Sequence, residues 1–325
     1  MRICVIGLGS MGKRRIKLLK LLRSDVIITG IDNNTKRVES VAEEYGIECY
    51  SNLSDIVEKL DCAFVCTPPN LHASIINECL ENNLHVFSEI NLIDNLYEEN
   101  MKLAKQKGKV LFLSSTPLYK EEMRIIDSRV KQNSKICAYS YHIGQYLPDW
   151  HPWECLKDFF VSSKKTNGCR EILAIELPWI QNTFGKIKTI HVLKKKFTEL
   201  KLNFPDTYFI YMEHENGNIG SLIVDVVSRQ AVRAMEIFNE DMYIRWDGTP
   251  ETLYEKDIVT GRMEQIVAGR YFRDKRYSEL INEYAYMKEI EEFFEVLNGK
   301  KALYNFEKDK DTLRIIDEIE DGMTF

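Results

Sequence analysis

The stretch that decides the fold is Ile3-Cys4-Val5-Ile6-Gly7-Leu8-Gly9-Ser10-Met11-Gly12, at the start of the 325-residue chain. A short apolar run leads directly into Gly-x-Gly-x-x-Gly, and residues 13–22 follow with helical spacing. This order of strand, turn and helix is typical of a dinucleotide-binding fingerprint. Gly7 permits the tight turn, Gly9 leaves space for a pyrophosphate beside the backbone, and Gly12 lets the helix pack close to its strand.

A second strand-like run, residues 27–31, ends at Asp32. Its distance from the glycines is close to the roughly 20 residues expected for a carboxylate that binds the cofactor's ribose. Such a carboxylate repels a 2′-phosphate, so we predict NAD rather than NADP as the cofactor. Lys36 and Arg37 lie just beyond and could weaken that preference.

Strand and helix signals alternate through the first third of the chain, and Asn70 has the side chain of a helix N-cap. Repeated βα units predict a parallel sheet with right-handed crossovers. The predicted strands are 2–6, 26–31, 62–66, 84–87 and 110–113, and the predicted helices are 36–45, 71–81 and 96–107.

The pattern changes after about Thr116. A connecting helix is expected over 119–130, and mainly strands beyond it. Asn216-Gly217 lies between two alternating runs and is a strong hairpin signal. The later elements are expected at 207–213 and 220–228 (a hairpin), 232–238 and 242–246 (a second hairpin), and 278–297 and 309–319 (helices).

These patterns predict a two-domain α/β chain. Residues 1–118 form a Rossmann domain, a doubly wound parallel sheet that binds NAD. Residues 119–325 form an α+β domain with a large open antiparallel or mixed sheet, for substrate binding and oligomerisation.

Composition argues against several protein classes. Charged residues make up 29% of the chain and the formal charge is −6, which disfavours nucleic-acid binding. No apolar run approaches the ~20 residues of a membrane span, and the first residues enter a strand at once, as expected without a signal peptide. The eight cysteines are scattered without a Cys-x-x-Cys pair, so we expect a reduced, cytoplasmic protein without a metal site.

Three segments together resemble the Gfo/Idh/MocA family of NAD(P)-dependent oxidoreductases: the turn at 7–12, Thr67-Pro68-Pro69-Asn70-Leu71-His72, and His85-Val86-Phe87-Ser88-Glu89. The resemblance implies a Rossmann domain followed by a sheet domain. It also implies a sugar or cyclitol substrate and assembly into dimers or tetramers.

The sequence departs from the family at the reactive centre. The family's Glu-Lys-Pro is replaced by Glu89-Ile90-Asn91, and isoleucine cannot move a proton. In the second-domain signature, Glu171 aligns with the family's acid and Ile175 with its histidine. A slip of one residue would put Glu176 at the histidine instead.

A replacement for the missing groups is expected in the segment 144–154, which holds two Trp, one Tyr, one His and two acids. Aromatic faces suit a sugar ring, and His151 has a side chain whose pKa suits proton transfer near pH 7. The alternative is a packed loop in which His151 is only hydrogen-bonded in place. Similar Tyr-Leu-Pro-Asp-Trp-His-Pro loops occur in family members from surface-polysaccharide gene clusters.

The predicted site has three groups of residues. By resemblance, His72 and Glu89 lie on the cofactor side, although His72 could also be plain helix surface. The predicted catalytic residues are His151, Glu176, Glu171 and Glu89; the predicted cofactor-binding residues are Gly7, Gly9, Ser10, Met11, Gly12, Asp32, Asn33, Arg37, Cys66, Thr67, Pro68, Asn70, His72 and Glu89; the predicted substrate-binding residues are Tyr146, Trp150, His151 and Trp153.

The favoured function is an NAD-dependent oxidoreductase acting on a sugar or nucleotide-sugar hydroxyl or ketone, with surface-polysaccharide synthesis as the setting. One alternative is redox-neutral, NAD-assisted elimination or epimerisation. Another is an NAD-binding sensor or assembly protein that has lost catalysis. The expected partners are a small sugar-type substrate and copies of the same chain, as a homodimer or homotetramer, with no nucleic acid and no membrane.

Overall fold

The computed structural model describes residues 1–150, 159–269, 272–274 and 280–322, and the chain divides into two compact units. The first unit contains Met1–Ser115 and Tyr286–Asp311, and the second contains Thr116–Ala285 and Thr312–Phe325. The predicted boundary at residue 118 lies near the break after Ser115. Residues 286–311 were predicted in the second domain, but they group with the first unit.

The first unit has a six-stranded parallel sheet in the order β3-β2-β1-β4-β5-β6. This is the doubly wound order: β2 and β3 are added on one side of β1 and β4 to β6 on the other, with all strands parallel. The predicted Rossmann domain is therefore confirmed. The strands are β1 (Arg2–Ile6), β2 (Ile27–Ile31), β3 (Glu48–Tyr50), β4 (Cys62–Val65), β5 (His85–Ser88) and β6 (Leu111–Leu113).

Of the helices between these strands, the one that begins at Thr35 has a side-chain cap. The Asn34 side chain accepts a hydrogen bond from the backbone N–H of Arg37. Asn70 was predicted to cap the next helix, and this was wrong. Pro69 occupies the first helical position, which its fixed φ suits, so Asn70 lies inside the helix. These helices are α1 (Ser10–Leu22), α2 (Thr35–Tyr45), α3 (Pro69–Glu81) and α4 (Tyr97–Lys107).

Helix α7 (Glu283–Leu297) explains why the chain returns to the first unit. Its Phe293 packs edge-on against Phe64, Phe87 and Phe112, with ring centroids 5.2, 5.7 and 5.7 Å away. These three rings come from β4, β5 and β6. Burial of the Phe293 side chain among them stabilises the returned helix.

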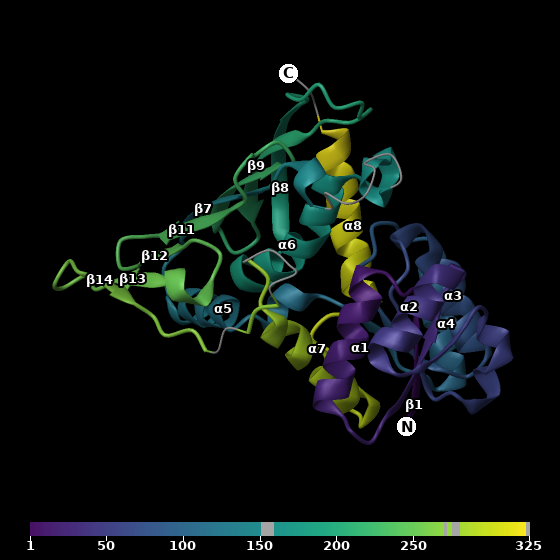
Figure 1. Ribbon diagram of the computed structural model, residues 1–325. Coiled ribbons are helices and arrows are strands. Elements are labelled where there is room, and N and C mark those ends of the chain that lie inside the picture. The colour runs from purple at the N-terminus through teal and green to yellow at the C-terminus, as the bar shows by residue number, and fades with distance from the viewer. Residues whose placement is uncertain (151–158, 270–271, 275–279, 323–325) are drawn as a thin grey trace. The chain divides into compact units, whose positions relative to one another are not determined.

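The second unit has an eight-stranded mixed sheet in the order β14-β13-β12-β11-β7-β10-β9-β8 (Figure 1). Only β7 and β10 pair in parallel, and the predicted hairpins β9–β10 and β11–β12 are confirmed. The strands are β7 (Ala138–Gly144), β8 (Ile187–Lys195), β9 (Thr207–His214), β10 (Ile219–Asp225), β11 (Val232–Phe238), β12 (Tyr243–Trp246), β13 (Tyr254–Lys256) and β14 (Met263–Gln265).

One long helix of this unit, α6 (Gly168–Phe184), packs along β9 and β10. The sequence analysis expected mainly strands in this half and missed it. Most of α6 is buried and Pro178 lies inside it, so its residues show no amphipathic repeat. This half also contains η3 (Thr116–Tyr119), α5 (Glu121–Gln132) and further short 3₁₀ helices. Helix α8 (Phe306–Asp321) begins in the first unit and ends in the second.

Candidate functional site

The glycine-rich turn joins β1 to α1, and its three glycines have different surroundings. Gly7 has φ +93°, and an added Cβ would lie 2.8 Å from the backbone of Cys66 and Thr67. A Cβ on Gly12 would lie 1.9 Å from the carbonyl oxygen of Gly7. A Cβ on Gly9 would meet nothing within 4 Å. Packing therefore requires glycine at positions 7 and 12, whereas nothing within the described residues requires it at position 9.

The turn also presents the amino end of α1. Gly9 is the N-cap residue, and no side chain caps this helix end. Free backbone N–H groups and the positive end of the helix dipole favour a phosphate at such a position. The predicted Ser10 and Met11 form the first turn of this helix.

Asp32 follows β2 and is held by backbone N–H groups. Its Oδ2 accepts a hydrogen bond from Leu8 at 2.7 Å, and its Oδ1 accepts one from Asn34 at 2.8 Å. The Arg37 guanidinium lies 3.7 Å from Oδ2. Each carboxylate oxygen keeps a second lone pair, which a ribose hydroxyl could use. Asn33 and Arg37 are exposed beside it.

We expect this protein to bind NADH roughly tenfold or more tightly than NADPH, because the Asp32 carboxylate opposes a 2′-phosphate. Parallel fluorescence titrations with the two reduced cofactors measure the difference. Tighter binding of NADPH would show that Arg37, not Asp32, governs the preference.

His72 lies on α3 and is buried, with burial lowering its pKa. Its Nδ1 lies 2.7 Å from Asn91 Oδ1, and its Nε2 lies 2.6 Å from the carbonyl oxygen of Thr67. Both ring nitrogens are therefore used inside the protein. His72 ties the loop after β4 to the loop after β5, and its place on the cofactor side stays a prediction.

Two buried hydroxyl groups at the same edge of the sheet are unsatisfied. Thr67 Oγ1 follows β4 and Ser115 Oγ follows β6, and neither has a hydrogen-bond partner within the described residues. Buried polar atoms normally find partners. In open α/β sheets, ligands bind outside the carboxyl ends of the strands at the switch point, which is where Thr67 lies. The predicted Cys66, Pro68 and Asn70 belong to the same loop and helix start.

Glu89 follows β5 directly and pairs with a residue that the sequence analysis missed. The Arg15 guanidinium donates hydrogen bonds to both Glu89 oxygens, at 2.5 and 3.2 Å. The same guanidinium also donates to Glu289 at 2.6 Å. No sequence pattern predicts that Arg15 and Glu289 pair with each other, because each looks like a typical charged residue on a helix surface.

In the second unit, Glu176 is fully buried in a hydrogen-bonded network. It accepts hydrogen bonds from the Tyr141 hydroxyl, the Trp179 indole N–H and the Arg233 guanidinium, each at 2.7 Å. Three donors hold the Glu176 side chain in place and link α6 to β7 and β11. Its predicted catalytic role stays a prediction.

The substitution Glu176→Gln should lower the free energy of unfolding by about 3 kcal/mol, because it removes the buried carboxylate that pairs with the Arg233 guanidinium. Urea unfolding of the variant and the wild type gives the difference. Unchanged stability together with lost turnover would instead restore Glu176 as a candidate for catalysis.

Glu171 lies one turn earlier on α6 and differs from Glu176 in its surroundings. Its Oε2 is buried and has no hydrogen-bond partner within the described residues. Burial raises the pKa of this carboxyl to about 7. The residue keeps partial exposure, as does Ile175 one turn further on. A carboxyl of this kind can donate or accept a proton near neutral pH.

The aromatic segment is described only in part, because His151 and Trp153 lie outside the described residues. Tyr146 is held by its backbone N–H, which donates to Ser228 at 2.7 Å, and its ring lies 4.2 Å from the Arg229 guanidinium carbon. The Trp150 indole N–H donates to the Gln145 carbonyl. Both aromatic side chains remain partly exposed, and their predicted substrate contacts stay a prediction.

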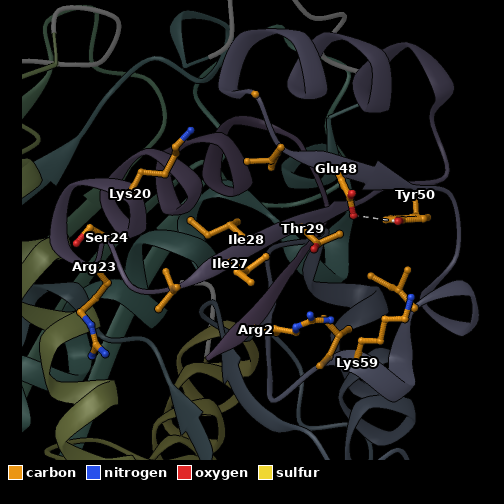
Figure 2. Close-up of a pocket in the computed structure, with 15 residues that line it drawn as sticks. Arg2, Lys20, Arg23, Ser24, Ile27, Ile28, Thr29, Glu48, Tyr50 and Lys59 are labelled. Carbon is orange, nitrogen blue, oxygen red and sulfur yellow. Dashed lines mark hydrogen bonds between the residues drawn. The ribbon is translucent and has the colours of Figure 1, made fainter.

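A separate groove of about 650 Å³ in the first unit is lined by none of the predicted cofactor residues (Figure 2). Four basic side chains line it, from Arg2, Lys20, Arg23 and Lys59. Lys20 donates to the Tyr45 carbonyl and Arg23 pairs with Asp25. Two of the four cations are thus already engaged, and we assign this groove no part in the site.

Two further features were searched for within the described ranges. In them, no helix has both the length and the apolar character of a membrane span. The same residues contain no group of three or more His, Cys, Asp or Glu side chains that could hold a metal ion.

Among the comparisons with known proteins, the match to a family model covers the first unit. Residues 1–115 match the GFO_IDH_MocA model, described as an oxidoreductase family with an NAD-binding Rossmann fold. This match confirms the predicted family resemblance and NAD as the cofactor. Myo-inositol 2-dehydrogenase of Thermotoga maritima is 31% identical over 111 residues, or 31% of this chain and 33% of the relative.

A second relative is 4-carboxy-2-hydroxymuconate-6-semialdehyde dehydrogenase of a Sphingobium species, 26% identical over 40% of this chain and 43% of the relative. The chain thus spans a third to two fifths of the length of the curated relatives it matches.

Solved structures match almost the whole chain. UDP-N-acetylglucosamine 3-dehydrogenase GnnA from Acidithiobacillus ferrooxidans superposes with a TM-score of 0.77 at 16% identity, covering 99% of this chain and 97% of that one. GenD2 from gentamicin A biosynthesis, solved with NAD, gives 0.77 at 14% identity, covering 98% and 92%. At these identities the likeness shows the fold, including the second, sheet-containing half.

Proposed function

We propose, from the premise that residues 1–115 belong to the Gfo/Idh/MocA family of NAD-binding oxidoreductases, that the whole chain is an NAD-dependent oxidoreductase. Its proposed substrate is a sugar or nucleotide-sugar hydroxyl or ketone. The observation that carries the proposal is the Gly9 position, where the protein leaves open the space that a pyrophosphate needs.

The described residues fit the cofactor. The turn at 7–12 and the amino end of α1 would hold the pyrophosphate, and Asp32 would hold the ribose hydroxyls. The unsatisfied Thr67 hydroxyl and the Glu89 carboxylate lie at the carboxyl ends of β4 and β5. When bound, NAD supplies a hydride acceptor, and NADH a hydride donor.

The substrate class is proposed from relatives and from the aromatic segment. Two of the matched proteins are named as dehydrogenases of an inositol and of UDP-N-acetylglucosamine. Partly exposed aromatic rings, here Tyr146 and Trp150, suit the apolar faces of a sugar. The setting in surface-polysaccharide synthesis and the cytoplasmic location stay predictions.

Glu171 is the best-supported proton-transfer residue among the four predicted. Glu176 is fixed by three donors, and Glu89 is bound by Arg15. His151 lies outside the described residues and stays the second candidate. In oxidation of a hydroxyl, the Glu171 carboxylate would take the hydroxyl proton; in reduction of a ketone, its acid form would give one.

A second function is favoured by a specific observation. Ile90 and Ile175 are partly buried apolar residues where the family places a lysine and a histidine. The chain could therefore use NAD without net redox, in elimination or epimerisation, or bind NAD as a sensor or assembly protein.

Assembly as a homodimer or homotetramer is also proposed. The sheet strands β9 and β10 carry the apolar side chains of Tyr211 and Ile219, whose exposed fractions are 53% and 56%.

One experiment separates these functions. The purified chain is incubated with NAD⁺ or NADH and a panel of sugars, nucleotide sugars and cyclitols, while NADH absorbance and substrate identity are followed. A net change in NADH supports the oxidoreductase. Substrate turnover at constant NADH supports redox-neutral chemistry. Tight cofactor binding with no turnover across the panel supports the sensor or assembly protein.

A further inference from the structure

We propose that Arg15, Glu89 and Glu289 form a buried triad whose single net negative charge favours the oxidised, positively charged nicotinamide over the reduced one. Glu289 of α7 acts here as a positioning residue, holding Arg15 and through it Glu89. This inference rests on the proposed function, because it requires that the first unit binds NAD at the carboxyl edge of its sheet.

The triad has close contacts and little exposure. Arg15 Nε donates to Glu89 Oε1 at 2.5 Å, and one Nη donates to Glu289 Oε2 at 2.6 Å. The side chains of Arg15 and Glu289 are completely buried, and that of Glu89 is 10% exposed. One guanidinium therefore pairs with two carboxylates that are largely excluded from solvent.

Hydrogen bonds and the Arg15 charge oppose the effect of burial on Glu289. Glu289 also accepts from the backbone N–H of Ser115 at 2.6 Å and from the Ser114 hydroxyl at 3.0 Å. Burial raises the pKa of Glu289, and the Arg15 charge acts against that rise. Three donors to one carboxyl group favour its charged form. Two carboxylates and one guanidinium leave a net charge of −1.

The Cys66 thiol beside Glu89 adds no charge to this sum. The Cys66 thiol lies 4.0 Å from Glu89 Oε1, and burial raises its pKa well above the usual value. Cys66 is therefore neutral at physiological pH. The Arg15 guanidinium otherwise faces the rings of Phe87 and Tyr286, at 4.6 and 5.1 Å from the ring centres.

The triad lies at the edge of the sheet where a bound nicotinamide ring would interact electrostatically with it. Glu89 follows β5, and its backbone N–H donates to Val65 at the end of β4, the strand beside the switch point. The oxidised nicotinamide ring carries a positive charge and the reduced ring carries none. A unit negative charge nearby, in a poorly hydrated site, therefore changes their relative affinities by roughly 3- to 30-fold.

Helix α7 thereby contributes to the cofactor site indirectly, through the contact of its Glu289 with Arg15. Its Glu289 is 274 residues from Arg15 in sequence, yet the two side chains pair, and helices α7 and α1 lie side by side in Figure 1. Without Glu289, Arg15 would pair with Glu89 alone, and the group would be neutral.

The test compares two substitutions on the same helix, Glu289→Gln and Glu292→Gln. Glu292 is also a buried carboxylate of α7, but it accepts from the Leu303 backbone and from Lys300, and makes no contact with Arg15. Calorimetric titration gives Kd values for NAD⁺ and NADH with each variant, and thermal unfolding confirms that each is folded.

We expect Glu289→Gln to weaken NAD⁺ binding roughly 3- to 30-fold while NADH changes less than about twofold, so that the ratio of the two Kd values moves. Glu292→Gln should leave this ratio unchanged. A merely structural role for Glu289 would weaken both cofactors equally, and that result, or an unmoved ratio, would overturn the proposal.

A second variant covers a failure of Glu289→Gln to fold. Glu89→Gln removes the same charge at the less buried end of the triad and should move the ratio in the same direction. If the wild type bound neither cofactor, the proposed function itself would fail. If the wild type bound both and Glu89→Gln left their ratio unmoved, only the triad proposal would fail.

Discussion

Replacing Gly9 by valine should abolish cofactor binding and leave the protein folded. The Gly9 backbone has φ −74°, which any residue adopts, and an added Cβ meets nothing within 4 Å. The valine side chain would instead fill the space proposed for the pyrophosphate. We expect NADH affinity to fall roughly 100-fold or more, with an unchanged melting temperature.

Gly12→Ala is the matched control in the same turn. Its Cβ would lie 1.9 Å from the Gly7 carbonyl oxygen, so this smaller substitution should destabilise the protein itself. Fluorescence titration and thermal unfolding of both variants distinguish the two effects. Wild-type NADH affinity in folded Gly9→Val would mean that no pyrophosphate lies against this turn.

The substitution Glu171→Gln should reduce turnover roughly 10²- to 10⁴-fold, the usual range for losing a general acid or base. NAD affinity should hardly change, because Glu171 belongs to the second unit and the cofactor turn to the first. Steady-state rates with the best substrate of the panel, with cofactor Kd values from titration, give both quantities.

The pH dependence supplies a second readout for Glu171. Its pKa of about 7 means that the carboxylate predominates above that pH and the acid below it. Oxidation, which needs the base form, should therefore speed up as pH rises through about 7, and ketone reduction should slow down. The same raised pKa makes the contribution of Glu171 to folding stability largest at low pH, and lost as pH rises through about 7.

Full turnover in Glu171→Gln, with its pH profile unchanged, would remove Glu171 from the mechanism. His151→Ala then becomes the decisive variant, with the same expected loss and an unchanged NAD affinity.

The sequence predicted most reliably those features that local patterns determine. The glycine turn, Asp32 at the end of its strand, and the hairpin at Asn216-Gly217 each follow from spacing within a few residues. The family resemblance added the loop containing His72, but not its geometry, in which Asn91 and Thr67 occupy both ring nitrogens.

The features that sequence analysis missed depend on contacts between distant segments or on burial. Arg15 and Glu289 are 274 residues apart, and neither lies in a local sequence pattern that predicts their ion pair. Helix α6 is buried on nearly all sides, so it lacks the repeat by which a surface helix is recognised. Glu171 and Glu176 lie on the same helix, and only the donors around each distinguish a fixed carboxylate from an available one.

The most direct test of the central claim follows a hydrogen atom. The wild-type protein is mixed, in excess, with NAD⁺ and a substrate that carries deuterium on its carbinol carbon, and the cofactor is analysed by mass spectrometry after a single turnover. An NAD-dependent oxidoreductase predicts deuterium in the reduced nicotinamide, with none in the Gly9→Val variant. A substrate that is consumed while the cofactor stays free of deuterium would contradict hydride transfer by this protein.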